Sequence, residues 1–507
     1  MTLINALSWV RRTATGATAR IFLIGGCIGS VANADIRFAD MSAAIPEHVY
    51  DGGWEHFVGG GVAVFDCNRD GLADLFAAGG ENPATMLRNT GDFGFEPISI
   101  DPIRKATGAY PIDIDADGWV DLYVMRVGPD VVLKGQAGCQ FTDATAQWGI
   151  PQTDRWTTAL TAWWEDDTRP VIALGHYVDR ANEDGPFGAC DSNTILRPEP
   201  NGYEARDLSP GYCALSMLAG PDARGRKTLR ISNDRQYYVR DGQEQLWDID
   251  KQRFLTEADG WPKVMLWGMG IASADLTGDG VDEVMLTSMG DQVMQLAMPD
   301  GTYAPAPFGI GTYAQRPYMG DDGRPSTGWH AQFGDINNDT RQDLFIAKGN
   351  VDQMPSNAMK DPNNLLVQNA EGTFDEMAET AGVADTSRSR GAALADFDGD
   401  GRLDLVVVNR RAPMRIYRNV GDTAHWLEVS LLQPGGNRMA IGAEVTVNGQ
   451  TQQLRIGGGH AGGSALPLHF GLGDDTRATI KVVWPDGTTT QIEASGDQTL
   501  LVEKPIR

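Results

Sequence analysis

Five segments of this 507-residue chain repeat one acidic pattern, with oxygen-bearing side chains at relative positions 1, 3, 5 and 9. A short apolar run follows every segment. One match could arise by chance, but five define a repeat. The repeated side chains are Asp66, Asn68, Asp70 and Asp74; Asp113, Asp115, Asp117 and Asp121; Asp275, Thr277, Asp279 and Glu283; Asp335, Asn337, Asp339 and Asp343; and Asp396, Asp398, Asp400 and Asp404.

This set of donors predicts calcium sites. Calcium takes about six to eight oxygen ligands, and alternate side chains of a curled loop can converge on one ion. No histidine or cysteine stands at a ligand position, which argues against zinc and copper, and magnesium demands a tighter octahedron. We therefore expect about five Ca²⁺ sites. The simpler alternative is that the segments are acidic turns, where Asp, Asn and Gly are common in any case.

The five sites are not equivalent. The loops that begin at Asp113 and Asp396 carry four carboxylates each and are expected to bind best. The third loop has Thr277 at position 3. In the fourth loop Thr340 replaces the glycine found at position 6 of the others, so we expect a strained turn and the weakest occupancy at the Asp335 site.

The loops do not resemble EF-hands. An EF-hand requires a glutamate at position 12 and flanking helices. Position 12 is apolar in every copy, and the runs that follow, such as residues 405–408, are typical of short buried strands. Each loop is therefore expected to connect two strands.

The spacing of the loops predicts the number of units. Their first aspartates, at 66, 113, 275, 335 and 396, are separated by 47, 162, 60 and 61 residues. The long gap has room for two units that have lost the motif, and traces remain at 163–174 and 217–232. Units of about 40–60 residues with several short strands suit a β-propeller. We predict an all-β fold in which residues 35–423 form a seven-bladed β-propeller with calcium loops.

A second repeated phrase marks the ends of units. It is an aromatic residue followed by Asp or Glu and small residues, and it occurs at Phe141, Phe254 and Phe374. The phrase also occurs at Phe38, before the first loop, and the seventh unit lacks it. We therefore expect residues 36–44 to supply the outer strand of the last blade, which would close the ring and protect its edges.

The N-terminus is typical of a secretory signal. Arginines precede an apolar segment that is too short to span a membrane, and a small-x-small cleavage pattern follows. We predict residues 1–34 to be a signal peptide and the protein to be exported, to the periplasm or the extracellular space. Two other interpretations are a twin-arginine signal and a lipid anchor. The residues concerned are Arg11, Arg12 and Arg20, the segment 21–31, Ala32-Asn33-Ala34, the expected mature start Asp35, and Cys27 as the lipidated residue.

Charge and hydropathy limit the partners. The chain has 68 acidic and 42 basic residues, for a formal net charge of −26. This acidity argues against nucleic acid or an anionic membrane as a partner. No segment beyond the N-terminus is long and apolar enough for a transmembrane helix, so we expect no membrane insertion.

Four cysteines follow the predicted signal, and an even number in an exported protein permits disulfides. Cys190 and Cys213 both lie in the region of the two degenerate units. We predict a disulfide between them that stabilises these units, in which the calcium loops are missing. Cys67 lies inside the first acidic loop, and the sequence leaves its pairing open.

The pattern changes after residue 423. The acidic loops stop, and alternating strands with glycine-rich turns appear at 426–432, 443–448, 453–456 and 479–484. We predict a small β-sandwich over residues 424–507.

Two groups of motifs resemble known families. The acidic loops, with glycine-rich strands before them such as residues 57–65, resemble FG-GAP/VCBS repeats of the integrin-α-type propeller, and the tail resembles the ASPIC/UnbV module. Together they resemble the cartilage acidic protein family over nearly all of the mature chain. The resemblance implies a calcium-binding, extracellular, adhesion-like protein. The tail motifs are Trp426-Leu-Glu-Val, Asn437-Arg438, Ala440-Ile441-Gly442-Ala443, Gly457–Gly459, His469-Phe470-Gly471-Leu472-Gly473 and Val483-Trp484-Pro485-Asp486-Gly487; the departures are the two degenerate units, Thr340 and Ser464-Ala465-Leu466.

No catalytic motif accompanies these features. The sequence has no Gly-x-Ser-x-Gly, His-Glu-x-x-His or phosphate loop, so we expect no enzyme. The leading hypothesis is a non-catalytic scaffold for adhesion or for binding an unidentified protein or glycan. The alternative is a secreted hydrolase or a lectin-like carbohydrate-active protein that uses the axial face of the propeller. In that case His56, His330, Trp163, Trp164 and Trp267 would line its channel, although packing between sheets is their simpler role.

Overall fold

The computed structural model describes residues 35–506 except 183–188, 235–241 and 314–322. The predicted signal peptide and its alternatives at Arg11-Arg12 and Cys27 lie outside the described residues. Residues Asp35–Arg507 form one compact unit. Its regular structure is almost entirely β, which confirms the predicted all-β class. The short helices of the described residues are η1 (Ser42–Ala44), η2 (Trp54–His56), η3 (Glu257–Asp259), η4 (Phe308–Ile310) and α1 (Ala378–Ala381).

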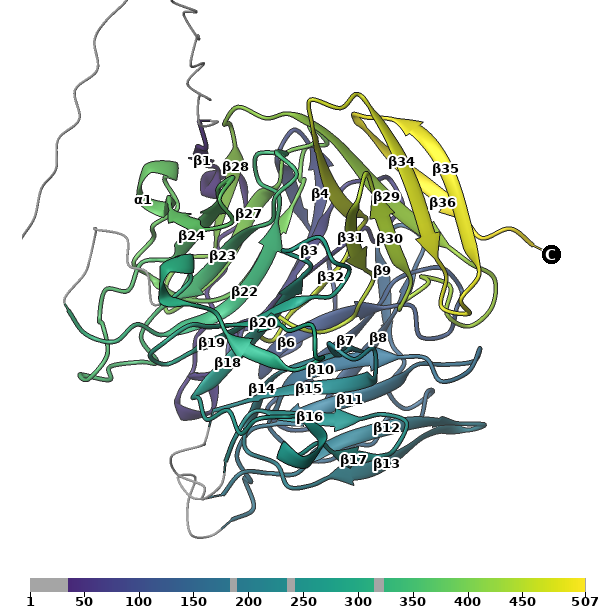
Figure 1. The fold of residues 1–507 in the computed structure, drawn as a ribbon. Helices are drawn as coiled ribbons and strands as arrows, with labels where there is room; N and C mark the ends of the chain where they lie inside the picture. Colours follow the sequence, from purple (N-terminus) through teal and green to yellow (C-terminus); the bar gives the residue numbers. More distant parts are fainter. Residues whose placement is uncertain (1–34, 183–188, 235–241, 314–322, 507) are drawn as a thin grey trace, which may run out of the picture. The chain divides into compact units, whose positions relative to one another are not determined.

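The chain up to residue 419 forms four-stranded antiparallel sheets that repeat one plan, with the strands side by side in chain order (Figure 1). The last sheet takes its fourth strand from the N-terminus. The sheets are β2 (Val62–Phe65), β3 (Asp74–Ala77), β4 (Thr85–Gly91), β5 (Gly94–Pro97); β6 (Ala106–Ile112), β7 (Asp121–Arg126), β8 (Val131–Gln136), β9 (Gln140–Asp143); β10 (Thr157–Trp163), β11 (Val171–His176), β12 (Asn193–Glu199), β13 (Gly202–Leu208); β14 (Ala214–Pro221), β15 (Lys227–Asn233), β16 (Gln245–Asp248), β17 (Arg253–Phe254); β18 (Gly268–Ala274), β19 (Glu283–Ser288), β20 (Val293–Ala297), β21 (Tyr303–Pro305); β22 (Gly328–Gly334), β23 (Asp343–Lys348), β24 (Asn364–Gln368), β25 (Phe374–Glu376); and β26 (Arg388–Ala395), β27 (Asp404–Arg410), β28 (Arg415–Asn419), β1 (Phe38–Asp40).

The sheets pack against one another through their first strands. Strands β2, β6, β10, β14, β18, β22 and β26 contact each other in this order, and β26 contacts β2 again. The degenerate region 121–275 therefore holds two complete sheets, β10–β13 and β14–β17, as the spacing of the loops predicted.

The N-terminal strand completes the last sheet. Strand β1 pairs antiparallel with β28, and Phe38 lies opposite Asn419 while Asp40 lies opposite Tyr417. The prediction that residues 36–44 supply this strand is confirmed.

The region from His425 onward forms two further sheets, whose strands are drawn mainly in yellow in Figure 1. Buried side chains of both sheets, among them Leu427, Val429, Val445 and Ile480, belong to one apolar cluster. The strands are β29 (His425–Leu432) between β33 (Leu468–Gly473) and β36 (Gln498–Glu503) in one sheet, and β31 (Gln450–Gln453), β30 (Glu444–Val447), β34 (Arg477–Val483) and β35 (Thr489–Ser495) in the other.

A glycine-rich segment of this C-terminal region, residues 456–465, lies along the first strands of the repeated sheets. Its backbone forms isolated bridges with Ala162 of β10, Leu218 of β14, Ile271 of β18 and Ala109 of β6. It ends in the short strand β32 (Ser464–Ala465), which pairs parallel with β2. Segment 456–465 thus joins sheets that are far apart in the sequence.

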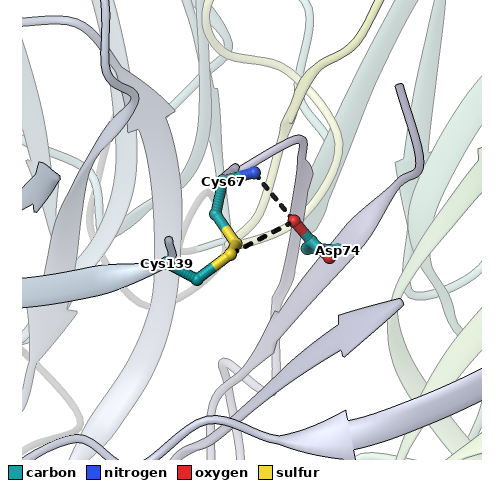
Figure 2. Close-up of side chains that lie close together, drawn as sticks. All are labelled: Cys67, Asp74 and Cys139. Carbon is teal, nitrogen blue, oxygen red and sulfur yellow. Dashed lines mark hydrogen bonds between the residues drawn. A yellow bond between two sulfur atoms is a disulfide. The ribbon is translucent and has the colours of Figure 1, made fainter. Parts of the chain in front are cut away.

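Two disulfides connect parts of the chain. The predicted Cys190–Cys213 bond is confirmed, and it joins the third repeated sheet to the fourth. Cys67, whose pairing the sequence left open, bonds to Cys139 and so joins the first loop to the second sheet (Figure 2).

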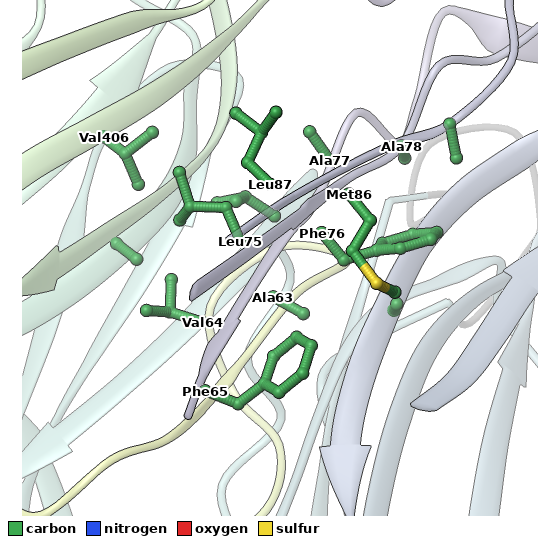
Figure 3. Close-up of a cluster of buried hydrophobic side chains, with 14 of the residues drawn as sticks. Ala63, Val64, Phe65, Leu75, Phe76, Ala77, Ala78, Met86, Leu87 and Val406 are labelled. Atoms are coloured by element: carbon green, nitrogen blue, oxygen red, sulfur yellow. The ribbon is translucent and has the colours of Figure 1, made fainter. Parts of the chain in front are cut away.

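The apolar core continues from sheet to sheet. Figure 3 shows Phe65 and Leu75 of the first sheet in one cluster with Val406 of β27. Strand β3 is buried at every position, because sheets cover both of its faces. The runs after the acidic loops do not alternate between apolar and polar residues, because both faces of these strands are buried.

Removing the anchor of β1 should weaken the fold. Phe38 is only 7 % exposed and packs in a cluster with residues of β23 and β27. We expect Phe38→Ala to lower the free energy of unfolding by about 3–5 kcal/mol, measured by urea denaturation. Deletion of residues 35–45 should destabilise at least as much.

The matched control is Arg37→Ala, whose side chain forms only an exposed ion pair with Asp35. It should change stability by less than about 0.5 kcal/mol. Equal stability of the Phe38→Ala variant and the unaltered protein would contradict the closure of the last sheet by β1.

Candidate metal centres

The five acidic loops occupy the same place in their sheets. Each loop begins directly after the first strand, and its position-9 acid is the first residue of the second strand. These acids are all buried, and they are Asp74, Asp121, Glu283, Asp343 and Asp404. The structure therefore brings the predicted ligands of each loop together at one end of a pair of inner strands.

Two carboxylates shape each loop. In the last loop, Asp396 Oδ1 accepts the N–H of Gly399 at 2.8 Å and its Oδ2 accepts the N–H of Gly401 at 2.7 Å. The position-9 carboxylate of Asp404 accepts the N–H of Phe397 at 2.9 Å. The position-9 acid makes the same bond in every other loop, at 2.7–3.0 Å. The loop backbone is thus curled by its own acids.

The remaining oxygens form compact clusters of negative charge. One oxygen each from Asp113, Asp115 and Asp121 lie within 4.8 Å of one another, and those of Asp396, Asp398 and Asp404 do the same. Asp113 Oδ1 and Asp398 Oδ1 are buried without a hydrogen-bond partner. Unpaired buried carboxylate oxygens are costly unless a cation compensates them. Hard oxygen donors in this number fit Ca²⁺.

Burial also raises the pKa values of the position-9 acids. The pKa of Asp121 rises to about 8 and those of Asp74 and Glu283 rise to about 7, mainly through burial and in part through the neighbouring acids of the loop. Backbone N–H groups oppose these shifts. A bound divalent cation would reverse them, because an adjacent positive charge favours the ionised form.

Basic side chains approach some loops but not others. Lys134 Nζ pairs with Asp115 and lies 2.8 Å from Asp117, and Arg418 lies 2.5 Å from Asp398. Arg341 and Arg402 pair with Asp339 and Asp400 in their own loops. Within the part of the chain that the structure describes, no ion pair reaches the ligand carboxylates of the loops at 66–74 and 275–283. An ion in the two four-carboxylate loops would have to displace a cation.

Thr340 adopts a φ of 78°, close to the 81° of Gly401 at the equivalent position. This left-handed region disfavours a β-branched residue, so the strain expected at this turn is present. The Thr340 N–H nevertheless donates to Asp335 Oδ2 at 2.7 Å. The fourth loop therefore keeps the curl of the others.

Cys67 and Cys139 lie beside Asp74, as Figure 2 shows. Cys67 donates its N–H to Asp74 Oδ2 at 2.7 Å. Both sulfurs are in the disulfide, so neither is a thiolate that could bind a metal. The bond instead holds the first loop against the neighbouring sheet.

The two degenerate units use their acids differently. Asp167 Oδ1, in the third sheet, accepts the N–H of Gly436 at 2.8 Å, and Trp164 donates to the Gly436 carbonyl at 3.2 Å. Asp222, in the fourth sheet, accepts from the Arg226 side chain at 2.7 Å. These turns are held by hydrogen bonds to neighbouring residues.

Contacts of the C-terminal region with the loop ends were not predicted from the sequence. Asn338 of the fourth loop accepts a hydrogen bond from His469 Nε2 at 2.7 Å. A side chain at Gly471 would collide with Asp335, and one at Gly401 would collide with the Trp426 ring. The Arg455 guanidinium lies 2.5 Å from Asp282 of the third loop. The only sequence signal was the glycines themselves, which allow this close approach.

The residues considered for an axial channel do not converge on an open one. His330 accepts the His460 N–H at 3.1 Å, within segment 456–465. His56 is buried and packs edge-on against Tyr50, and Trp164 faces Gly436. Segment 456–465 lies along the first strands of several sheets. Packing explains most of these residues.

Comparisons with known proteins agree with this division of the chain. Residues 66–124 and 335–407 match the FG-GAP-like repeat model, and residues 433–506 match the ASPIC and UnbV model. The chain thus combines FG-GAP-like repeats with a C-terminal ASPIC and UnbV region, as its motifs predicted.

The curated relatives make the resemblance more specific. The chain is 28% identical over 496 residues to cartilage acidic protein 1 of Homo sapiens, which covers 87% of this chain and 71% of that protein. The Mus musculus protein of the same name is 25% identical over 479 residues, with 84% and 70% covered. The predicted resemblance to cartilage acidic proteins is confirmed.

Solved structures give weaker likenesses. BBS1N in complex with ARL6DN has a TM-score of 0.45 at 11% identity, covering 76% of this chain and 97% of that one. The six-bladed Aleuria aurantia lectin has a TM-score of 0.36 at 12% identity, covering 62% and 94%. The fold described above rests on the strand pairing alone.

The helices of the described residues are all short, and none has the length and apolar character needed to cross a membrane.

Proposed function

We propose that this chain is an exported, calcium-binding, non-catalytic scaffold for adhesion or for binding a protein or glycan. The observation that carries the proposal is the set of five acidic loops at the same end of five repeated sheets. Export is supported by two disulfides, which persist in oxidising compartments, and by the predicted signal peptide at 1–34.

The proposed architecture is a seven-bladed propeller over residues 35–423 and a β-sandwich over residues 424–507. Seven four-stranded sheets of the described residues support the blade count, together with the contacts of the first strands, which return from β26 to β2. The sandwich is supported by the apolar cluster shared by both C-terminal sheets.

The proposed ions are held by the side chains at positions 1, 3, 5 and 9 of each loop. Support comes from the unpaired oxygens of Asp113 and Asp398 and from the clustered carboxylates of the loops at 113–121 and 396–404. The ions would compensate charge and fix the turn between two strands of a blade. This is a structural role, and none of the ligand carboxylates is left over for catalysis in the way a glycosidase pair requires.

Calcium should stabilise the folded protein. Each site that is filled at 100 times its Kd adds about 2.7 kcal/mol, so the melting temperature should rise with Ca²⁺ and fall with EDTA. Asp398→Asn should reduce the rise caused by Ca²⁺, because it removes a proposed ligand. In EDTA it should lower the melting temperature only slightly, because the Arg418 guanidinium that it releases still contacts Asp400.

The control is Asp166→Asn in the degenerate third unit, which should respond to Ca²⁺ like the unaltered protein. A melting temperature that ignores both Ca²⁺ and EDTA would refute the metal sites.

The loop at Asp335 should release its ion more slowly than the loops at Asp66 and Asp275. Asp335, Asn337 and Asp343 are buried under the C-terminal region, whereas Asp70 and Asp279 are exposed. Stopped-flow release into a fluorescent chelator should therefore show a slow phase. His469→Ala should accelerate that phase about fivefold, the kinetic equivalent of about 1 kcal/mol for a lost buried hydrogen bond.

The fast phases serve as the internal control and should not change in the His469→Ala variant. A single rate for all ions would show that the C-terminal region does not cover the Asp335 site.

A scaffold of this kind should capture a ligand without converting it. We expect the mature protein to retain a protein or glycan on a glycan array or in a pull-down, with weaker capture after EDTA. Turnover of a polysaccharide or ester that survives loss of the acidic loops would instead favour the alternative, a secreted hydrolase. Binding confined to simple sugars would favour a lectin-like protein.

A further inference from the structure

A cavity of about 280 Å³ lies between the repeated sheets and the C-terminal region. Strands β18, β22 and β26 form one wall, and residues 451–469 form the other. Its apolar lining includes Ile271, Phe333 and Leu394. The volume is just below the range of about 300–1,000 Å³ that is usual for small-molecule sites, so an occupant would be small.

His330 gives the cavity a buried hydrogen-bond donor. The ring is 4 % exposed, and burial lowers its pKa to about 4, so it is neutral at pH 7. Its Nδ1 accepts the His460 N–H, which leaves the ring proton on Nε2. The Gln332 side chain interacts with the ring but leaves Nε2 without a hydrogen bond of full geometry. A ligand oxygen with better geometry could take this buried donor from Gln332.

His469 and Glu428 give the cavity acceptors. Asn338 Nδ2 donates to Gly401, so Asn338 Oδ1 is the acceptor for His469 Nε2 and the proton lies on that nitrogen. In the neutral ring His469 Nδ1 is then an acceptor, and it is buried without a partner. It lies 3.7 Å from Glu428 Oε1, so the two acceptors are neighbours and need two separate hydroxyl donors. Asp396 also lines the cavity, but it belongs to the last acidic loop and is assigned there to the proposed ion.

The charged lining excludes other ligand classes. Arg455 is the cation of the cavity, and it is already bound to Asp282 and Ser273, at 2.5 and 2.6 Å. An anion would therefore meet the Glu428 carboxylate without a free positive charge. A cation would match Glu428 but offer no acceptor to the His330 donor. A neutral molecule with several hydroxyl groups satisfies both kinds of partner, since each hydroxyl donates and accepts.

We propose that this cavity is a binding site for a neutral polyhydroxylated molecule of monosaccharide size, with His330 donating to one ligand oxygen and Glu428 and His469 accepting from its hydroxyls. The site borders the acidic loop at Asp396 but uses none of the proposed calcium ligands, and it does not depend on the scaffold function. The bound molecule would lie against the first strands β18, β22 and β26 of three repeated sheets.

The test uses the full mature protein with Ca²⁺ present. Glucose, galactose and myo-inositol are the neutral probes, and gluconate and glucosamine are charged counterparts of similar size. Saturation-transfer NMR and calorimetry should detect at least one neutral probe and bind it more tightly than either charged one. Ala274→Leu should fill the cavity and abolish binding, because Ala274 lines it and is only half-buried.

Glu428→Gln is a second variant, which should weaken binding about tenfold through loss of a charge-assisted hydrogen bond. The control is Asp101→Asn, in a separate cavity of about 170 Å³, which should bind like the unaltered protein. Thermal melts establish that each variant is folded. The proposal is overturned if no neutral probe binds, if gluconate or glucosamine binds equally well, or if a folded Ala274→Leu variant keeps its affinity.

Discussion

The turn from the first to the second strand is the constraint on which the repeated sheets depend. In five of them a carboxylate follows the first strand and another opens the second, as Asp396 and Asp404 do in the last sheet. Their bonds to Gly401 and Phe397 satisfy backbone donors that the reversal would otherwise leave unpaired. The same arrangement concentrates negative charge in a half-buried place. The loop shape and the proposed affinity for a cation therefore have one origin.

Sheets without this loop reach the same geometry by other means. In the third sheet Asp167 accepts a backbone N–H from Gly436 of the C-terminal region. The third and fourth sheets are joined by Cys190–Cys213. A disulfide and a long-range hydrogen bond thus stabilise the sheets that lack an acidic loop. The C-terminal region is a part of how the repeated sheets are held, since segment 456–465 bridges several of their first strands.

Sequence reasoning succeeded where the signal was local and periodic. The spacing of the acidic loops led to two complete sheets between 121 and 275, and the phrase at Phe38 led to the pairing of β1 with β28. It missed the contacts of the C-terminal region with the repeated sheets and the Cys67–Cys139 bond. The run at Gly457–Gly459 looked like a turn, but its glycines let the backbone lie against Met217 and Ile271. The Cys67–Cys139 bond depends on how two sheets are placed, which no local pattern encodes.

The placement of the C-terminal region links it to the acidic loops. Gly471 packs directly on Asp335, and Trp426 packs directly on Gly401, so each docks on a loop only in its curled form. An ion that favours the curled form would therefore favour docking. Linkage is reciprocal, so docking would strengthen ion binding by the same factor. The fourth loop illustrates this linkage. The strained turn at Thr340 disfavours its curled form, whereas the Gly473 N–H stabilises that form by donating to the Asn338 carbonyl at 2.9 Å. The loop with the poorest sequence for calcium is the one that the C-terminal region supports most.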